Sequence, residues 1–149
     1  MSLETKVMEQ LKDAMRAKDD VALRTLRAIK AAILIEQTAT GAKEALTEAD
    51  EVKLLSKMAK QRKDSLEIFT QQNRADLAAK EEEELAIIAK FLPAQLSEAE
   101  IEAAVRKVIE QVGASSAADF GKVMGMANKT LAGQADGKVV ADVVKRILQ

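Results

Sequence analysis

The 149-residue sequence contains neither cysteine nor histidine. Without cysteine there can be no disulfide, thiolate metal site or cysteine nucleophile. Without histidine the commonest general base and the commonest ligand of catalytic zinc are missing. Tryptophan and tyrosine are absent too, and the aromatic residues are Phe69, Phe91 and Phe120. This scarcity argues against single-strand stacking platforms and RRM-like modules, which use several aromatic side chains.

Long apolar segments are also lacking. No apolar run approaches the roughly 20 residues that a membrane-spanning helix needs. The first residues, MSLETKVMEQLKD, lack the apolar core of a signal peptide. We therefore expect a soluble, cytoplasmic protein with no membrane partner.

Aliphatic residues with helical spacing make up most of the apolar content, and proline occurs once, at Pro93. This composition favours helices over strands. The sequence predicts an all-α protein with an N-terminal region of about four helices, residues 1–92, which includes a long helical hairpin. After a boundary at LPAQLS, we expect a C-terminal domain of three short helices at residues 97–149.

Local signals predict where helices begin and end. Helix starts are expected at Ser2 and Asp136, and capping boxes at Thr47–Asp50, Ser97–Glu100 and, more weakly, Ser116–Asp119. Gly113 fits a helix end, and TATGAKEAL (38–46) is typical of a loop.

The helical period also predicts which side chains are buried. Met15 is expected on the apolar face of the first helix and Val139 on that of the last. The run Glu81–Glu84 is typical of a solvated face. Arg62 interrupts the apolar stripe of the long helix; it either extends out to solvent or pairs with an acid of another helix, and we expect the pairing.

Positive charge collects at the C-terminal end. Residues 117–149 hold five basic and three acidic residues, a net charge of +2. Lys122 and Lys129 are seven residues apart and thus share a helix face, and Lys138 and Lys145 repeat this spacing. The ordinary interpretation is a solvated face; the alternative is a surface for anions.

Gly121 and Gly125, four residues apart, leave a bare strip of backbone beside these lysines. They indicate either close packing between helices or close approach of a phosphate backbone. The spacing alone favours packing, and both explanations stay open.

Catalytic and metal-binding patterns are not recognisable. The sequence lacks a G-x-S-x-G elbow, a phosphate loop and a dinucleotide fingerprint, and Ser56 with Lys60 is a spacing common by chance. We therefore expect no catalytic residue, no metal site and no cofactor.

Five segments taken together resemble the GatB/YqeY family along nearly the whole chain: TLRAIKAAI (25–33), KQRKDSLEIF (60–69), RADLAAKEEEEL (74–85), FLPAQLSEAEI (91–101) and GKVMG…GQADGKVVADVVK (121–145). The last segment is similar to the tail domain of the GatB subunit of glutamine-dependent tRNA amidotransferase, the part that touches tRNA. The resemblance implies a C-terminal three-helix, tail-like domain. It also implies RNA-contacting candidates, which are Lys122, Lys129, Lys138 and Lys145 with the backbone of Gly121, Gly125, Gly133 and Gly137. Gln134 departs from the basic residue that related sequences often have there.

The resemblance implies a stand-alone module that binds tRNA or another RNA through its phosphate backbone, and we expect no DNA partner. One alternative is an amidotransferase-related carbon–nitrogen ligase with glutamine as amide donor, or its accessory subunit, associated with amidotransferase subunits or other translation proteins. Another is a protein–protein adaptor that works through the N-terminal hairpin.

Overall fold

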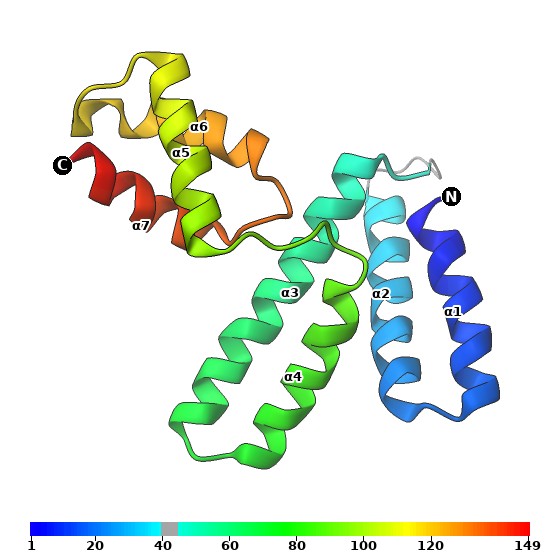
Figure 1. Cartoon of the computed structure of the whole chain (residues 1–149). Helices are drawn as coiled ribbons and strands as arrows, with labels where there is room; N and C mark the ends of the chain where they lie inside the picture. Colours follow the sequence, from blue (N-terminus) through cyan, green and yellow to red (C-terminus); the bar gives the residue numbers. More distant parts are fainter. Residues whose placement is uncertain (40–44) are drawn as a thin grey trace. The chain divides into compact units, whose positions relative to one another are not determined.

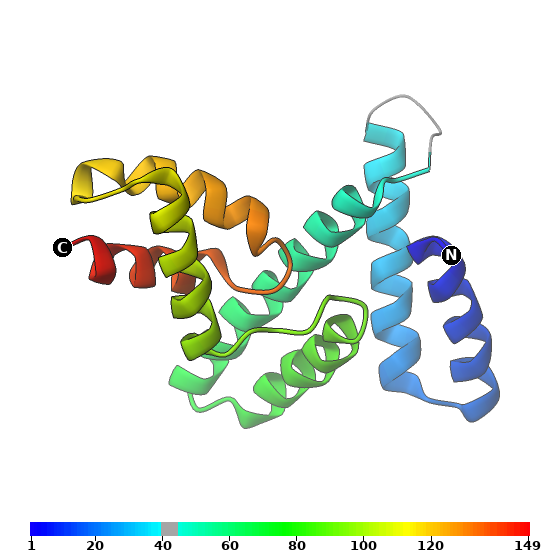
Figure 2. The ribbon, with the colours of Figure 1, turned by 45° about the horizontal axis from the view of Figure 1, so that its top comes forward.

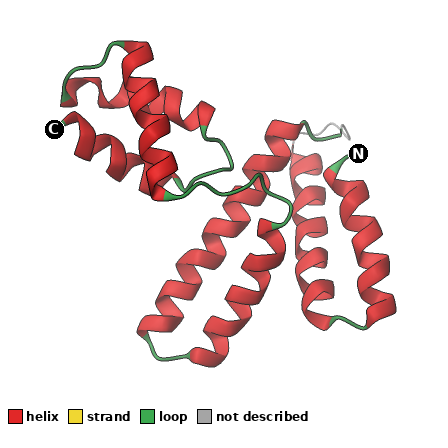
Figure 3. Cartoon of the chain, in the orientation of Figure 1, coloured by secondary structure: helices red, strands yellow, loops and turns green. Residues whose placement is uncertain are grey.

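The computed structural model describes residues 1–39 and 45–149. Within these ranges the chain forms seven α-helices, one 3₁₀ turn and no strand (Figures 1 and 3). The predicted all-α class is confirmed. The chain divides into two compact units, Met1–Leu92 (unit 1) and Pro93–Gln149 (unit 2), each with its own hydrophobic core. No helix in the described ranges is long and apolar enough to span a membrane.

Unit 1 contains two helical hairpins, which Figures 1 and 2 show as α1–α2 and α3–α4. The helices are α1 (Leu3–Ala17), α2 (Asp20–Ala39), α3 (Glu48–Gln71) and α4 (Ala75–Ala89). All four contribute to one core: Leu3, Val7, Leu11, Ala14, Leu26, Ile29, Ile33, Leu55, Met58, Ala59 and Ile88. The backbone amide of Leu3 also donates to Glu51 Oε2 at 2.8 Å, which ties the start of α1 to α3.

The predicted helix starts in unit 1 are confirmed. Ser2 accepts a hydrogen bond from the amide of Thr5, and Thr47 and Asp50 form the expected capping box. The prediction of a loop from residue 38 is wrong at its start, because α2 continues to Ala39. Thr38 fits the helix by donating its hydroxyl to the carbonyl of Leu34 at 3.0 Å. Residues 40–44 of the predicted loop lie outside the described residues.

Two predictions of buried side chains are wrong. Met15 is 54% exposed and Val139 38% exposed. The adjacent residues, which the helical period also predicts to be inward, are buried: Ala14 at 6% and Val140 at 1%. Neighbouring positions differ by about 100° around a helix, so a residue next to a buried one can already lie outside the side that packs against other helices and face solvent.

Arg62 forms the expected ion pair between helices. Its Nη2 lies 3.8 Å from Oε1 of Glu84 on α4, and both side chains are largely buried, 17% and 14% exposed. Arg24 of α2 approaches the same carboxylate oxygen to 4.0 Å. The expectation that Glu81–Glu84 is wholly solvated is therefore wrong at Glu84, whose carboxylate links three helices.

Unit 2 contains α5 (Glu98–Val112), a 3₁₀ turn η1 (Ala117–Asp119), α6 (Phe120–Thr130) and α7 (Gly137–Leu148). Its core is Ile101, Val105, Val108, Val123, Ala127, Leu131, Val140, Val143, Val144 and Leu148. The Ser97–Glu100 capping box and the cap at Asp136 are confirmed, and Gly113 ends α5 with φ 68°. The weaker signal at Ser116 begins η1, and α6 follows directly.

Candidate nucleic-acid interface

Helix α6 has one buried and one exposed side. Val123 and Ala127 are fully buried in the core of unit 2. Lys122 and Lys129 are exposed and lie outside the buried side, because their positions are rotated by roughly 100–160° from those of Val123 and Ala127. Seven residues of helix separate them along the axis by about 10 Å. The two lysines therefore belong to one outward strip of α6.

Gly121 and Gly125 lie on this exposed part of α6 and do not mediate helix packing. A Cβ placed on either residue would meet no described heavy atom within 4 Å, apart from the helix's own backbone and chain neighbours. The explanation that the spacing alone favoured, close approach of a second helix, is contradicted. The glycines leave a stretch of helix backbone that a ligand can approach.

Met126 also belongs to the strip, and it was not among the predicted RNA-contacting residues. Its side chain is 41% exposed, and it lies four residues after Lys122 and three before Lys129, the spacing of helix-surface neighbours. Its spacing placed it on this face, and only the absence of charge kept it from the list of candidates. The outward strip of α6 is thus Gly121, Lys122, Gly125, Met126 and Lys129.

The lysines of α7 are exposed as well, and the structure places one lysine of each pair at each end of the layer formed by α6 and α7. The Nζ atom of Lys145 lies 5.7 Å from the ring centroid of Phe120, so the end of α7 meets the start of α6. Lys122 and Lys145 therefore lie toward one end of the two-helix layer. Lys129 and Lys138 lie toward the other end, on either side of the connecting turn. The four lysines do not form one compact cluster.

None of these four lysines forms an ion pair with a carboxylate in residues 1–39 and 45–149, where every ion pair involves an arginine. Lys122 Nζ donates to the carbonyl of Val112 at 3.2 Å. This bond satisfies a carbonyl at the C-terminal end of α5 and holds the ammonium near the start of α6.

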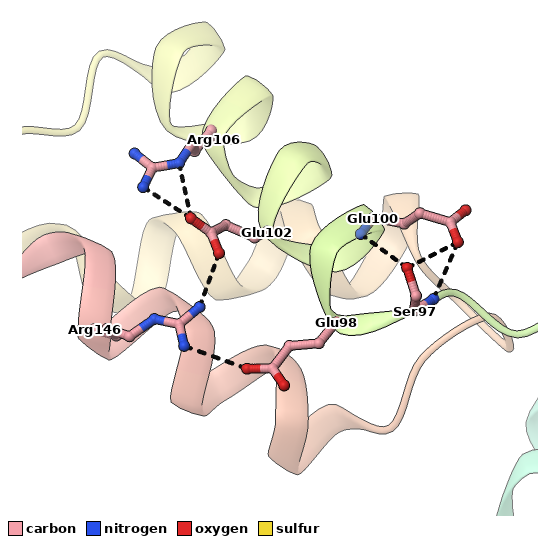
Figure 4. Close-up of polar contacts among 6 residues, drawn as sticks. All are labelled: Ser97, Glu98, Glu100, Glu102, Arg106 and Arg146. Atoms are coloured by element: carbon pink, nitrogen blue, oxygen red, sulfur yellow. Dashed lines mark hydrogen bonds and ion pairs between the residues drawn. The ribbon is translucent and has the colours of Figure 1, made fainter.

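Arg146, the remaining cation of the last helix, is already neutralised. It donates to Glu98 at 3.2 Å and to Glu102 at 3.0 Å, and Arg106 binds the other oxygen of Glu102 at 2.9 Å (Figure 4). The hydrogen bond from Arg106, with the charge of Arg146, lowers the pKa of Glu102. Since its charge is used within the unit, Arg146 is a poor candidate for a phosphate contact.

Asp119, just before α6, is likewise engaged. Its Oδ2 accepts from the amides of Ser115 at 3.0 Å and Ser116 at 3.4 Å. These two bonds, the stronger effect coming from Ser115, lower the pKa of Asp119. Its carboxylate is therefore held toward the preceding turn.

The turn between α6 and α7 is fastened to the start of unit 2. Gln95 Nε2 donates to the carbonyl of Gly133 at 2.6 Å, and the amide of Leu96 donates to the carbonyl of Gln134 at 2.9 Å. Gly133 has φ 75°, which favours glycine. Of the predicted glycines, Gly133 thus has a local structural explanation. Gly137, the first residue of α7, is open like those of α6.

Acidic clusters do not offer another site in the described part of the chain, where no group of three or more aspartates or glutamates could hold a metal ion.

The comparison with protein families matches the family described as YqeY-like protein over residues 4–148. The chain belongs to the YqeY-like family. The GatB/YqeY resemblance is thereby confirmed.

Curated YqeY-like relatives include the fungal proteins named "Altered inheritance of mitochondria protein 41, mitochondrial". The one from Lachancea thermotolerans is 40% identical over 111 residues, 72% of this chain and 58% of the relative. The one from Pyrenophora tritici-repentis is 31% identical over 149 aligned residues, 96% of this chain and 79% of the relative. A Saccharomyces cerevisiae relative is 39% identical over 106 residues, 67% and 55% respectively. The chain thus spans little more than half the length of the first and third of these.

The names of these relatives contradict the expected cytoplasmic location, because they describe mitochondrial proteins. That expectation depended on the lack of a membrane-spanning or signal-peptide segment. A protein in the interior of an organelle needs neither segment once it is there, so their absence does not distinguish the two locations.

Proposed function

We propose that this YqeY-like protein is an RNA-binding module that docks the phosphate backbone of tRNA on the outward strip of α6. The observation that carries the proposal is the open backbone at Gly121 and Gly125. Gly121 directly precedes Lys122, and Gly125 lies between Lys122 and Lys129. Neither lysine has a carboxylate partner among the described residues.

Physically, such a strip suits a sugar–phosphate chain. Without Cβ atoms at two successive turns, a bulky polymer can come close to the helix axis. The flanking lysines then reach phosphates on either side, and each contact releases counterions from the RNA. Contacts of this kind position RNA without reading its sequence. The resemblance of this segment to the tRNA-touching tail of the GatB subunit supports tRNA as the RNA.

The charges of α6 are tested by replacing both lysines, as Lys122→Gln with Lys129→Gln. Binding of tRNA is measured by fluorescence anisotropy over a series of salt concentrations. We expect weaker binding for all tRNAs and a plot of log K against log salt that is shallower by about 2 units, because two phosphate contacts are lost. Arginine at both positions should preserve the slope.

A matched control comes from α3. Lys53 and Lys60 are also exposed and seven residues apart on one helix, so glutamine at both removes the same charge with the same spacing. This pair should leave the slope almost unchanged. Equal losses from the two pairs would mean diffuse attraction and would contradict a site on α6. Absence of tRNA binding at low salt would refute the function itself.

A further inference from the structure

A hollow of about 290 Å³ opens at the end of unit 2 where α6 begins and α7 ends. Ala117, Phe120, Lys145, Leu148 and Gln149 line it. Small-molecule sites usually measure about 300–1,000 Å³. This hollow is therefore near the lower limit, large enough for one planar ring system and too small for a folded protein segment.

The walls combine an aromatic ring, apolar carbons and a cation. Phe120 is the only aromatic residue between positions 93 and 149. It is partly buried and packs against the core of unit 2, and this packing holds its ring in place. The ammonium of Lys145 lies 5.7 Å from the ring centroid, within the range of a cation–π interaction. A ring next to a cation suits a ligand that has both an aromatic group and a negative charge.

Two lysines without a carboxylate partner among the described residues lie at this end of unit 2. Lys145 forms no carboxylate ion pair in the described ranges, and Lys122 belongs to the same end of α6. The neighbouring carboxylate of Asp119 is held by the amides of Ser115 and Ser116. A phosphate that leaves the α6 strip at Lys122 would therefore approach Lys145 at the rim.

We propose that this hollow receives the base of one unpaired nucleotide in the bound RNA. The base lies against Phe120 and Leu148, and the phosphate of that nucleotide contacts Lys145. This inference rests on the proposed RNA-binding function and adds to it a preference for duplex RNA that carries an extruded base. Gln149 offers an amide to the edge of the base, and the ring contact accepts any of the four bases.

The test uses the full chain and three RNA duplexes of one sequence. One duplex is fully paired, one has a single-nucleotide bulge, and one has an abasic bulge with the same backbone distortion but no base. We expect the bulged duplex to bind about tenfold more tightly than the paired one, the size of effect given by stacking one base. The abasic duplex should behave like the paired one. Equal binding of the bulged and abasic duplexes would overturn the inference and leave the proposed function intact.

Two substitutions locate the effect. Ala117→Leu fills the hollow from the exposed turn η1, and Phe120→Leu removes the ring while keeping an apolar side chain in the core. Each should abolish the preference for the bulge and leave affinity for the paired duplex unchanged. If Phe120→Leu unfolds unit 2, Ala117→Leu still decides the question. A preference that survives Ala117→Leu overturns the inference, whereas failure of every duplex to bind at low salt refutes the proposed function and the inference together.

Discussion

Gly125→Ala tests the open backbone of α6 more directly than any change of charge. Gly125 is in the middle of α6 and has helical backbone, and a Cβ there meets no described atom within 4 Å. Glycine inside a helix costs about 0.5–1 kcal/mol relative to alanine. With no clash to offset this gain, the substitution should stabilise unit 2 by about 0.5–1 kcal/mol. If the strip contacts RNA backbone, the same methyl group should weaken tRNA binding.

Gly113→Ala is the matched control. A Cβ at Gly113 also has open space, but φ is +68°. Alanine in this left-handed conformation costs roughly 1–2 kcal/mol. The same chemical change should therefore stabilise the unit at one glycine and destabilise it at the other. Gly113→Ala should affect tRNA binding only as far as it unfolds the unit.

Native-state hydrogen exchange of amides in α6 and α7 is the suitable assay. It reports on unit 2 within the full chain, and the sequence has no tryptophan or tyrosine for fluorescence. Slower exchange with weaker tRNA binding is the expected result for Gly125→Ala. If Gly125→Ala speeds exchange, the space beside Gly125 is occupied in the folded protein and the reasoning fails. Slower exchange with unchanged tRNA affinity would remove the glycines from the proposed interface.

Two further predictions concern stability. Ile88 is fully buried among α1–α4, so Ile88→Ala should lower the free energy of unfolding by about 2–5 kcal/mol, whereas Ile68→Ala, at a side chain that is 50% exposed, should lower it much less. Urea unfolding followed by circular dichroism measures both values. Similar losses of stability would contradict the described core. The pKa of Asp119 is lowered from 3.8, mainly by the amide of Ser115, so its contribution to stability is complete above pH 3.8 and is lost as the pH falls through the lower folded value. The stability difference between the wild type and Asp119→Asn should therefore shrink as the pH falls below 3.8, and a constant difference would show that the carboxylate charge does not matter.

The sequence alone was sufficient for features that depend on a few neighbouring residues. The capping boxes at Thr47 and Ser97, the cap at Asp136 and the left-handed Gly113 all form within a single turn of chain. Such interactions have the same geometry wherever the helix later packs. The helical class followed from the same local preferences.

Features that depend on neighbours distant in sequence were decided by the tertiary structure. Periodicity indicated that Arg62 would pair with an acid, but only packing brought Glu84 of α4 and Arg24 of α2 to it. Periodicity also placed Met15 and Val139 on buried apolar faces, and the arrangement of the adjacent helices left both exposed.

The candidate site shows the same division. Spacing placed Lys122 with Lys129, and Lys138 with Lys145, on common helix faces. It could not show that each end of the α6–α7 layer holds one lysine of each pair, nor that Gly121 and Gly125 face open space. Helix periodicity determines the direction of a side chain around its own axis. What that side chain then meets is decided only when another helix, or a partner molecule, occupies the space beside it.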